Sequence, residues 1–344
     1  MSDETLEAFG KRWNRRQPDL VFEPEDAELK PGAIELGIPA LDELLAGGIP
    51  RGRTSIFYGA EAAGKTLLSQ LVIAAAQRQG GIAVFADIER TFDAKWFGLT
   101  GVDLDPKKLI IVRPDSLEQA FDMAEDAMRT VQPDVLVLDS IAALVPQAQL
   151  DVEMSKQDFR GLSARKTTEG VKKLTLANKK TALIIINQMR IDMGVTFGSP
   201  ENMPGGRALR HAASIIIRIR RGQWLTDVAE RKLGREEFTA IESKKGDAKR
   251  VGFMLKLNVE KNKLATPWQD IDVKFFFNGE VDPLGSLIHL AVQRSVIEVT
   301  GKGYYQIPDT DKVLHGLGAV EVLLRMDEQL KNKIIRLVRE TRYA

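Results

Sequence analysis

Cysteine is absent from this sequence, and histidine occurs only at positions 211, 289 and 315. Disulfides, thiolate metal sites and cysteine nucleophiles are therefore excluded, and the wide spacing of the histidines gives a histidine-based metal site little support. Long apolar runs are also missing, since stretches such as Ala182–Ile186 are far too short to span a bilayer. The N-terminus, MSDETLEAF, lacks the basic and then apolar order of a signal peptide. We therefore expect a cytoplasmic protein that does not bind membranes.

The two signs of charge are nearly balanced, because the chain has 49 lysines and arginines and 48 aspartates and glutamates. This balance neither predicts nor excludes a nucleic-acid partner, which only local clustering of charge could indicate. With 344 residues and 44% hydrophobic content, the chain is long and apolar enough for one large core domain with smaller additions.

The most informative stretch is Thr54–Thr66, TSIFYGAEAAGKT, in which a strand pattern runs into Gly-x-x-x-x-Gly-Lys-Thr. In such a phosphate-binding loop the glycines let backbone N–H groups surround a polyphosphate, the lysine reaches the β- and γ-phosphates, and the threonine hydroxyl can hold Mg²⁺. A helix expected over Leu67–Gln79 would point its positive end at the same anion. An accidental glycine-rich turn is the competing interpretation, but the strand before and the helix after favour the phosphate loop. The candidate nucleotide contacts here are Gly59, Ala60, Glu61, Ala62, Ala63, Gly64, Lys65, Thr66 and Leu67.

Strand and helix patterns alternate after this loop. We expect strands over Ile82–Asp87, Leu109–Val112, Pro133–Asp139 and Thr181–Asn187, and helices over Ser116–Val131 and Ser163–Ala177. Further strands follow without a long helix between them, over Ser214–Arg220, Phe238–Glu242, Val251–Val259 and Ile271–Phe277. The sequence therefore predicts an α/β fold whose mostly parallel, helix-covered sheet is extended by antiparallel strands.

The predicted organisation has three parts. Residues 1–33 contain a short amphipathic helix with a basic end, Thr5–Arg16, and a linker; this part is either a frayed tail or an arm that docks on a neighbouring subunit. Residues 34–279 form the core, which begins with a short helix over Pro39–Leu45. Residues 280–344 form a small α/β C-terminal domain, indicated by the patterns over Leu284–Ile297, Tyr304–Ile307 and Gly318–Val338.

Acidic and amide side chains follow the strands that should flank the phosphate loop, at the edge where parallel sheets bind ligands. Asp139 ends VLVLD and is placed to orient Mg²⁺, through a water molecule, while Glu89 is the best candidate to activate the attacking water. Asn187 and Gln188 end the next buried strand. Their amides could sense the γ-phosphate or merely cap the strand, and the spacing does not decide between these interpretations.

Six segments occur in order: GIPALDELLAGGIPRGR, GAEAAGKT, ADIERTFDAKW, VLVLDSIAAL, INQMRIDMGVTFGSPENMPGGRAL and VEKNKLATPW. Together they resemble the bacterial and phage RecA-type homologous recombinases, from roughly Ile34 to Phe277, and the INQ-to-PGGRAL segment is far more specific than the phosphate loop alone. The resemblance implies a P-loop NTPase core that uses ATP and Mg²⁺. It makes Glu89 the catalytic glutamate and Gln188 the residue that couples the γ-phosphate to DNA.

Three further assignments follow from the resemblance. Asp93 and Trp96 fall where the family places an acidic residue and an aromatic ring against adenine. Lys261 and Lys263 match a pair that reaches the ATP of the neighbouring subunit. Gln149–Gly161 and Met189–Gly206 match the two DNA-binding loops, and glycine-rich segments without periodicity are typical of segments that become ordered on a ligand. The implied DNA-binding residues are Arg165, Lys172, Arg190, Met193, Gly205, Gly206 and Arg207.

The sequence departs from the family in three places. The first loop contains DVEMSKQDFR, Gly222–Arg250 is long and charged, and Lys331–Arg342 replaces the acidic tail that is common in the family. The prediction is a DNA-dependent ATPase that forms filaments on single-stranded DNA, pairs it with homologous duplex DNA and exchanges strands. The alternatives are a ring-forming helicase or motor with the same core, and a non-catalytic nucleotide-binding mediator of recombination.

Overall fold

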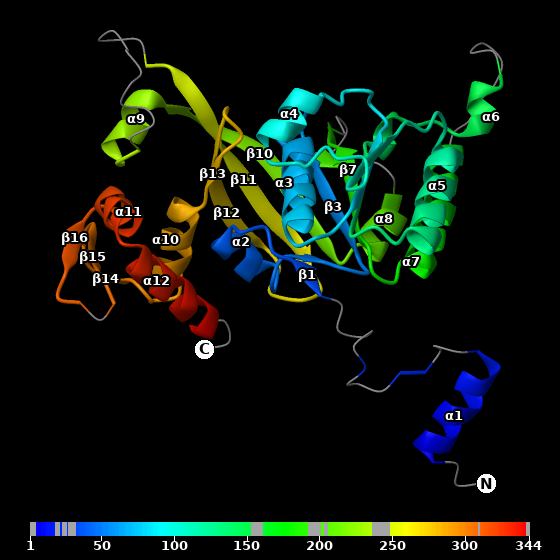
Figure 1. Cartoon of the computed structure of the whole chain (residues 1–344), viewed down its shortest axis with the longest axis horizontal. Helices are drawn as coiled ribbons and strands as arrows, with labels where there is room; N and C mark the ends of the chain where they lie inside the picture. Colours follow the sequence, from blue (N-terminus) through cyan, green and yellow to red (C-terminus); the bar gives the residue numbers. More distant parts are fainter. Residues whose placement is uncertain are drawn as a thin grey trace.

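A nine-stranded sheet forms the centre of the molecule (Figure 1), in the order β13-β12-β11-β10-β3-β7-β6-β4-β5. The computed structural model describes residues 5–17, 21–22, 26, 32–152, 161–191, 201–202, 206–235, 248–308 and 310–341, with the backbone alone at 190–191, 201–202 and 206–207. The strands from β10 to β5 are parallel to one another, and β11, β12 and β13 extend the sheet by antiparallel pairing. The predicted α/β fold is confirmed. The parallel strands are β3 (Thr54–Gly59), β4 (Ala83–Asp87), β5 (Leu109–Val112), β6 (Val135–Asp139), β7 (Ala182–Gln188) and β10 (Ile215–Thr226).

Helices cover both faces of the sheet. Alternate side chains of β3 point to opposite faces, so that Phe57 packs with α3 (Lys65–Arg78) and Ile56 packs with the helices on the other face. That second layer contains α5 (Leu117–Thr130), α7 (Leu162–Ala177) and α8 (Gly206–Ala212). Because both faces are buried, the central strands are apolar over most of their length, which makes them easy to recognise in the sequence.

The antiparallel extension is built on a long hairpin. β10 pairs with β11 (Arg250–Asn262), and the last pair of this hairpin is Thr226 with Arg250. β12 (Gln269–Phe276) then pairs with β11, and β13 (Val281–Asp282) pairs with β12 at the edge of the sheet. A short helix, α9 (Asp227–Lys232), follows β10 and was not expected from the sequence. The expected strand Phe238–Glu242 lies outside the described residues.

Several short elements complete the core. They are β1 (Ala33–Ile34), α2 (Pro39–Leu44), β2 (Ile49–Pro50), α4 (Ala94–Leu99), the 3-10 helix Ile141–Ala143, α6 (Gln147–Leu150), β8 (Arg190–Ile191) and β9 (Glu201–Asn202). β1 pairs with β2, and β8 pairs with β9, both antiparallel.

The C-terminal part combines three helices with a separate three-stranded sheet. Its elements are α10 (Leu284–Gln293), β14 (Glu298–Gly301), β15 (Tyr304–Gln306), β16 (Val313–His315), α11 (Leu317–Met326) and α12 (Glu328–Glu340). The helical pattern expected over Gly318–Val338 is divided at Asp327, whose side chain accepts a hydrogen bond from the Leu330 N–H at 2.9 Å and so begins a new helix. Buried residues of α10, α11 and α12 belong to the same apolar cluster as α3 and the sheet. The division into domains at residue 280 remains a prediction.

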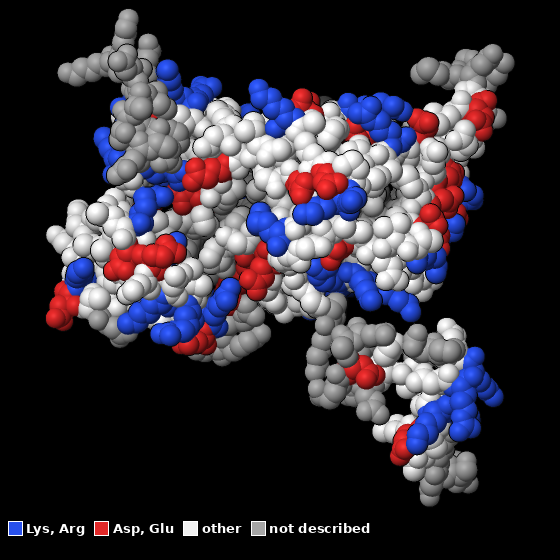
Figure 2. All heavy atoms as spheres, in the orientation of Figure 1, with Lys and Arg blue, Asp and Glu red and all other residues white. Residues whose placement is uncertain are grey.

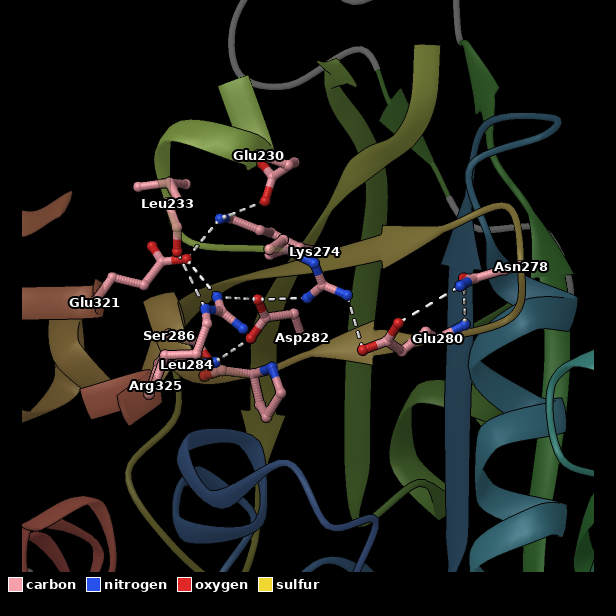
Figure 3. A network of polar contacts seen from close by, with 12 residues as sticks. Glu230, Leu233, Lys274, Asn278, Glu280, Asp282, Leu284, Ser286, Glu321 and Arg325 are labelled. Atoms are coloured by element: carbon pink, nitrogen blue, oxygen red, sulfur yellow. Dashed lines mark hydrogen bonds and ion pairs between the residues drawn. The ribbon is translucent and has the colours of Figure 1, made fainter. Parts of the chain in front are cut away.

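A buried network of ion pairs also joins the C-terminal part to the sheet (Figure 3). Lys274 of β12 donates to Glu230 of α9 at 3.1 Å and to Glu321 of α11 at 2.9 Å. Arg325 of α11 donates to Asp282 of β13 at 2.7 Å. Three chain segments far apart in sequence therefore meet through charged groups that are mostly shielded from water.

The N-terminal helix α1 (Leu6–Arg16) stands away from the rest of the chain (Figure 1) and has no buried residue. Leu6 is 91% exposed, and a strip of basic side chains lies along the helix, whereas both signs of charge are scattered over the visible face of the core (Figure 2). The exposed apolar residue is consistent with an arm that docks elsewhere, which remains a prediction. Across the described residues, we find no helix with the length and apolar character needed to traverse a bilayer.

Candidate active site

The phosphate loop lies between β3 and α3, as the sequence predicted, and two of its glycines are required by the packing around them. Gly59 faces Ile219 of β10, and a Cβ atom at Gly59 would lie 2.1 Å from the Ile219 carbonyl oxygen. Gly64 has φ +103°, and a Cβ atom there would lie 2.7 Å from Leu255 Cδ1. A side chain at Gly59 would displace the backbone of β10, whereas Gly64 is favoured by its left-handed backbone conformation, so the loop is held close against its strands.

The first half of the loop is open to solvent, whereas its lysine is buried and held by the loop itself. Ala60, Glu61 and Ala62 are exposed, whereas Ala63 and Leu67 pack into the core, so that only their backbones could contact a phosphate. Lys65 Nζ donates to the carbonyl oxygens of Gly59 at 3.3 Å and Ala60 at 2.7 Å. Burial lowers the pKa of Lys65, and the negative charges of nearby carboxylates oppose this shift.

The two candidate magnesium ligands are in direct contact. Thr66 Oγ1 donates to Asp139 Oδ2 at 2.6 Å, which joins the start of α3 to the end of β6. Burial raises the pKa of Asp139 to about 6, and the nearby charge of Glu89 adds to the shift, while the bond from Thr66 opposes it. A buried carboxylate beside a threonine hydroxyl suits Mg²⁺, which prefers oxygen ligands and retains several waters. Within the described residues no group of three or more metal-binding side chains occurs.

Glu89 is fixed beside Asp139 by both its backbone and its side chain. The N–H groups of Ile88 and Glu89 donate to the Asp139 carbonyl oxygen at 2.9 and 3.2 Å. Glu89 Oε1 accepts hydrogen bonds from Ser140 Oγ at 2.6 Å and from Gln188 Nε2 at 3.0 Å. The structure therefore brings together the expected base and the expected γ-phosphate sensor. Gln188 also faces Gly59 in the pairing of β3 and β7, which places it next to the phosphate loop.

Sequence reasoning missed three residues that support this arrangement. Ser140 binds Glu89, and the buried Asp87 accepts hydrogen bonds from the N–H groups of Thr91 at 2.8 Å and Phe92 at 3.2 Å. Arg113 Nε donates to the same Asp87 carboxylate at 2.9 Å. Asp87 and Arg113 therefore hold the turn that carries Glu89. The position of Asp87 at the end of a strand, like that of Asp139, was the available signal.

Asp93 and Trp96 have structural roles of their own. Asp93 Oδ1 accepts a hydrogen bond from the Trp96 N–H at 2.7 Å and so begins α4. The Trp96 ring packs edge-on against Phe275, with 5.9 Å between ring centroids. Their expected contact with adenine remains a prediction.

Lys261 and Lys263 lie at the end of β11 and hold the end of α8. Both ammonium groups donate to the His211 carbonyl oxygen, at 3.5 and 3.3 Å, and Lys261 also donates to the carbonyl oxygen of Arg210. Burial lowers the pKa of Lys261, and the positive charges of Lys263 and Arg210 add to the shift. In the sheet Lys261 pairs with Ile216 of β10. Ile216 lies three residues before Ile219, which is the residue of β10 that pairs with Gly59 of the phosphate loop. The pair thus lies apart from the phosphate loop of its own chain.

The described residues include the side chains of two of the expected DNA-binding residues. Arg165 and Lys172 are exposed on α7, and because they are seven residues apart they lie on one face of the helix. Arg165 also forms an ion pair with Glu169, with 3.6 Å between Nε and Oε1. The backbones of Arg190, Gly206 and Arg207 lie in β8 and at the start of α8. Met193 and Gly205 are outside the described residues, as is most of each expected DNA-binding loop.

The raised pKa of Asp139 predicts that the site destabilises the protein when no nucleotide or Mg²⁺ is bound. Folding favours the protonated carboxyl, because the pKa of Asp139 is higher in the folded protein than in the unfolded chain. The contribution of the protonated Asp139 to the free energy of unfolding is therefore complete below about pH 4 and is lost as the pH rises through about 6. Asp139→Asn stays neutral and retains an acceptor for Thr66. It should therefore raise the free energy of unfolding at pH 8 by up to about 3 kcal/mol.

Urea unfolding between pH 5 and 8, without nucleotide or Mg²⁺, measures this effect. The advantage of Asp139→Asn should shrink toward pH 5, whereas the exposed control Asp151→Asn should differ little from the unaltered protein at every pH. An Asp139→Asn protein that is less stable than the unaltered chain at pH 8 would contradict the prediction.

Comparison with known proteins gives consistent matches. A family model described as the RecA N-terminal domain matches residues 24–282. Protein RecA of Chloroherpeton thalassium is 38% identical over 319 residues, which cover 92% of this chain and 83% of that protein. Protein RecA of Thermus thermophilus is 40% identical over 275 residues, which cover 79% of this chain and 74% of that protein. Protein RecA of Chlorobaculum parvum is 38% identical over 342 residues, covering 98% and 90%.

Proposed function

The chain belongs to the RecA family, and from this premise we propose that it is an ATPase, activated by single-stranded DNA, that assembles along the strand and pairs it with homologous duplex DNA. The recombinase function expected from the six sequence segments fits this membership. The family model and the three relatives above do not favour a ring-forming helicase or a non-catalytic mediator. We expect the protein to act in the cytoplasm.

The observation that carries the proposal is the meeting of Glu89, Gln188 and Asp139 beside the phosphate loop. The loop backbone and Lys65 would bind the phosphates of ATP, and Thr66 and Asp139 would hold Mg²⁺, which offsets charge on the β- and γ-phosphates. Glu89 would take the proton of the attacking water. These groups lie at the carboxyl ends of neighbouring parallel strands, where ligands bind in sheets of this type.

Communication with DNA would run through the segment that follows Gln188. Gln188 is the last residue of β7, and the chain then passes through 189–205 to α8. If Gln188 exchanges its bond with Glu89 for one with the γ-phosphate, the start of this segment moves with it. The state of the nucleotide would thereby change the affinity for DNA, and DNA binding would change the rate of hydrolysis.

Assembly would complete the site. Lys261 and Lys263 contact α8 in their own chain and lie apart from its phosphate loop. We propose that they contact the ATP of a neighbouring subunit, so that positive charge supplied in trans stabilises the transition state. Hydrolysis would then require a filament and would favour its disassembly.

The test is ATP turnover by the purified protein with and without single-stranded DNA, followed by strand exchange between that DNA and a homologous duplex. We expect turnover to rise at least tenfold on DNA, because assembly brings the lysine pair to the neighbouring site. Equal turnover without DNA would contradict the proposal. Directional unwinding of a forked duplex by closed hexamers would support the helicase, and ATP binding without turnover on saturating DNA would support the mediator.

A further inference from the structure

Ser140 uses its side chain in an unusual way for its position. It is fully buried, directly follows Asp139 and precedes the 3-10 helix Ile141–Ala143. A serine at the start of a helix normally accepts a hydrogen bond from a backbone N–H of the first turn. Here the hydroxyl makes no such bond and instead donates to Glu89 Oε1 at 2.6 Å. Its contact is therefore with the candidate base and not with the local helix.

The two donors to Glu89 act on the same oxygen. Ser140 and Gln188 both donate to Oε1, and in the described part of the chain no hydrogen bond to Oε2 occurs. Two donors on one oxygen fix the carboxylate plane and leave the second oxygen available as an acceptor. A water molecule that attacks the γ-phosphate would donate its proton to that second oxygen.

The donors differ in their freedom to move. Gln188 is exposed at the end of β7 and has a long side chain, whereas Ser140 is enclosed and its hydroxyl oxygen can move only by rotation about the Cα–Cβ bond. If Gln188 turns to the γ-phosphate, Ser140 is the donor that remains on Glu89. The backbone bonds from Ile88 and Glu89 to Asp139 keep the two strands in place during this exchange.

We propose that Ser140 is a positioning residue for ATP hydrolysis, which holds Oε1 of Glu89 so that Oε2 faces the attacking water after Gln188 has left. The inference rests on the proposed function. Loss of the hydroxyl should lower kcat, because the base samples unproductive orientations, but it should leave ATP binding unchanged, because the hydroxyl bonds Glu89 and not the phosphate loop.

The test measures kcat and KM for ATP on single-stranded DNA for Ser140→Ala. We expect kcat to fall about tenfold, with KM and the affinity for a fluorescent ATP analogue within about twofold of the unaltered protein. The matched control is Ser286→Ala, which removes another buried hydroxyl that also donates at 2.6 Å, to the Pro283 carbonyl, but lies in the C-terminal part. It should leave kcat unchanged.

A double-mutant cycle distinguishes positioning from a general structural role. In a Glu89→Gln background, where the base is already lost, Ser140→Ala should have no further effect on the residual rate. An equal loss in both backgrounds, or an unchanged kcat in the single variant, would overturn the proposal for Ser140. If the unaltered protein fails to hydrolyse ATP, or Glu89→Gln is fully active, the proposed function fails instead.

Discussion

Glu89→Gln should lower the DNA-activated turnover of ATP by at least about a hundredfold, since a positioned general base contributes roughly 10²–10⁴ in rate. Glutamine has nearly the same shape, and its amide oxygen can still accept from Ser140 and Gln188. The backbone bonds that place residue 89 beside Asp139 do not involve the side chain. The substitution therefore removes the basicity of the group and little of the geometry.

Binding should separate from turnover in this variant. ATP should bind with an affinity within about threefold of the unaltered protein, because the phosphate loop is intact, and DNA binding should persist in ATP for longer, because hydrolysis no longer ends it. Single-turnover kinetics and the lifetime of the DNA complex measure the two effects. Glu328→Gln, at an exposed residue of α12, is the control. Turnover within threefold of normal would remove Glu89 from its proposed role.

The parts of the site that sequence predicted are those carried by local patterns. An apolar strand that ends at Asp139 or Gln188 gives the position of each residue at the sheet edge, and parallel pairing then brings them together. The family read from the six segments is confirmed by the matches to RecA proteins. The roles of the individual residues remain predictions.

Other contacts depend on the third dimension and left no local signal. Ser140 is a residue type that is common at the start of a helix, so nothing in its neighbourhood indicates another role. Its bond to Glu89 spans 51 positions in the chain. Lys261 and Lys263 have the sequence of a solvated strand end, yet they bind the last carbonyl groups of α8. Arg235 occurs in the long charged stretch Gly222–Arg250, yet only 3% of its surface is exposed. In each case the partner comes from a distant segment.

The network around Asp282 predicts the largest change in stability. Asp282 Oδ2 accepts from Arg325 at 2.7 Å and from Arg235 at 2.9 Å, and only 4% of the residue is exposed. Burial alone would raise the pKa of Asp282, but the hydrogen bonds from Arg325 and Leu284 and the two positive charges outweigh it and hold the pKa below its usual value. The ionised carboxylate is therefore the form that binds the two arginines at neutral pH.

Asp282→Ala should lower the free energy of unfolding by about 3–5 kcal/mol, because it leaves the buried guanidinium of Arg235 and the partly buried one of Arg325 without the anion between them. Glu280 and Glu321 still pair with these arginines and limit the loss. Since Arg325 belongs to α11 and Asp282 to β13, the C-terminal part should also loosen from the sheet. Urea unfolding measures the first effect, and faster hydrogen exchange in α10 and α11 measures the second.

Asp272→Ala is the matched control, because it removes an aspartate from the same sheet in an exposed ion pair. Asp272 lies 3.5 Å from Lys256, and the two side chains are 45% and 47% exposed. Water replaces the lost partner there, so the expected loss is below about 1 kcal/mol. Similar losses in the two variants would mean that the buried network does not hold the C-terminal part to the sheet. A large loss for Asp282→Ala alone would show that the C-terminal part is held to the sheet by ion pairs. The charged groups of the sheet side of this network lie in β12, in β13 and in the segment after β10.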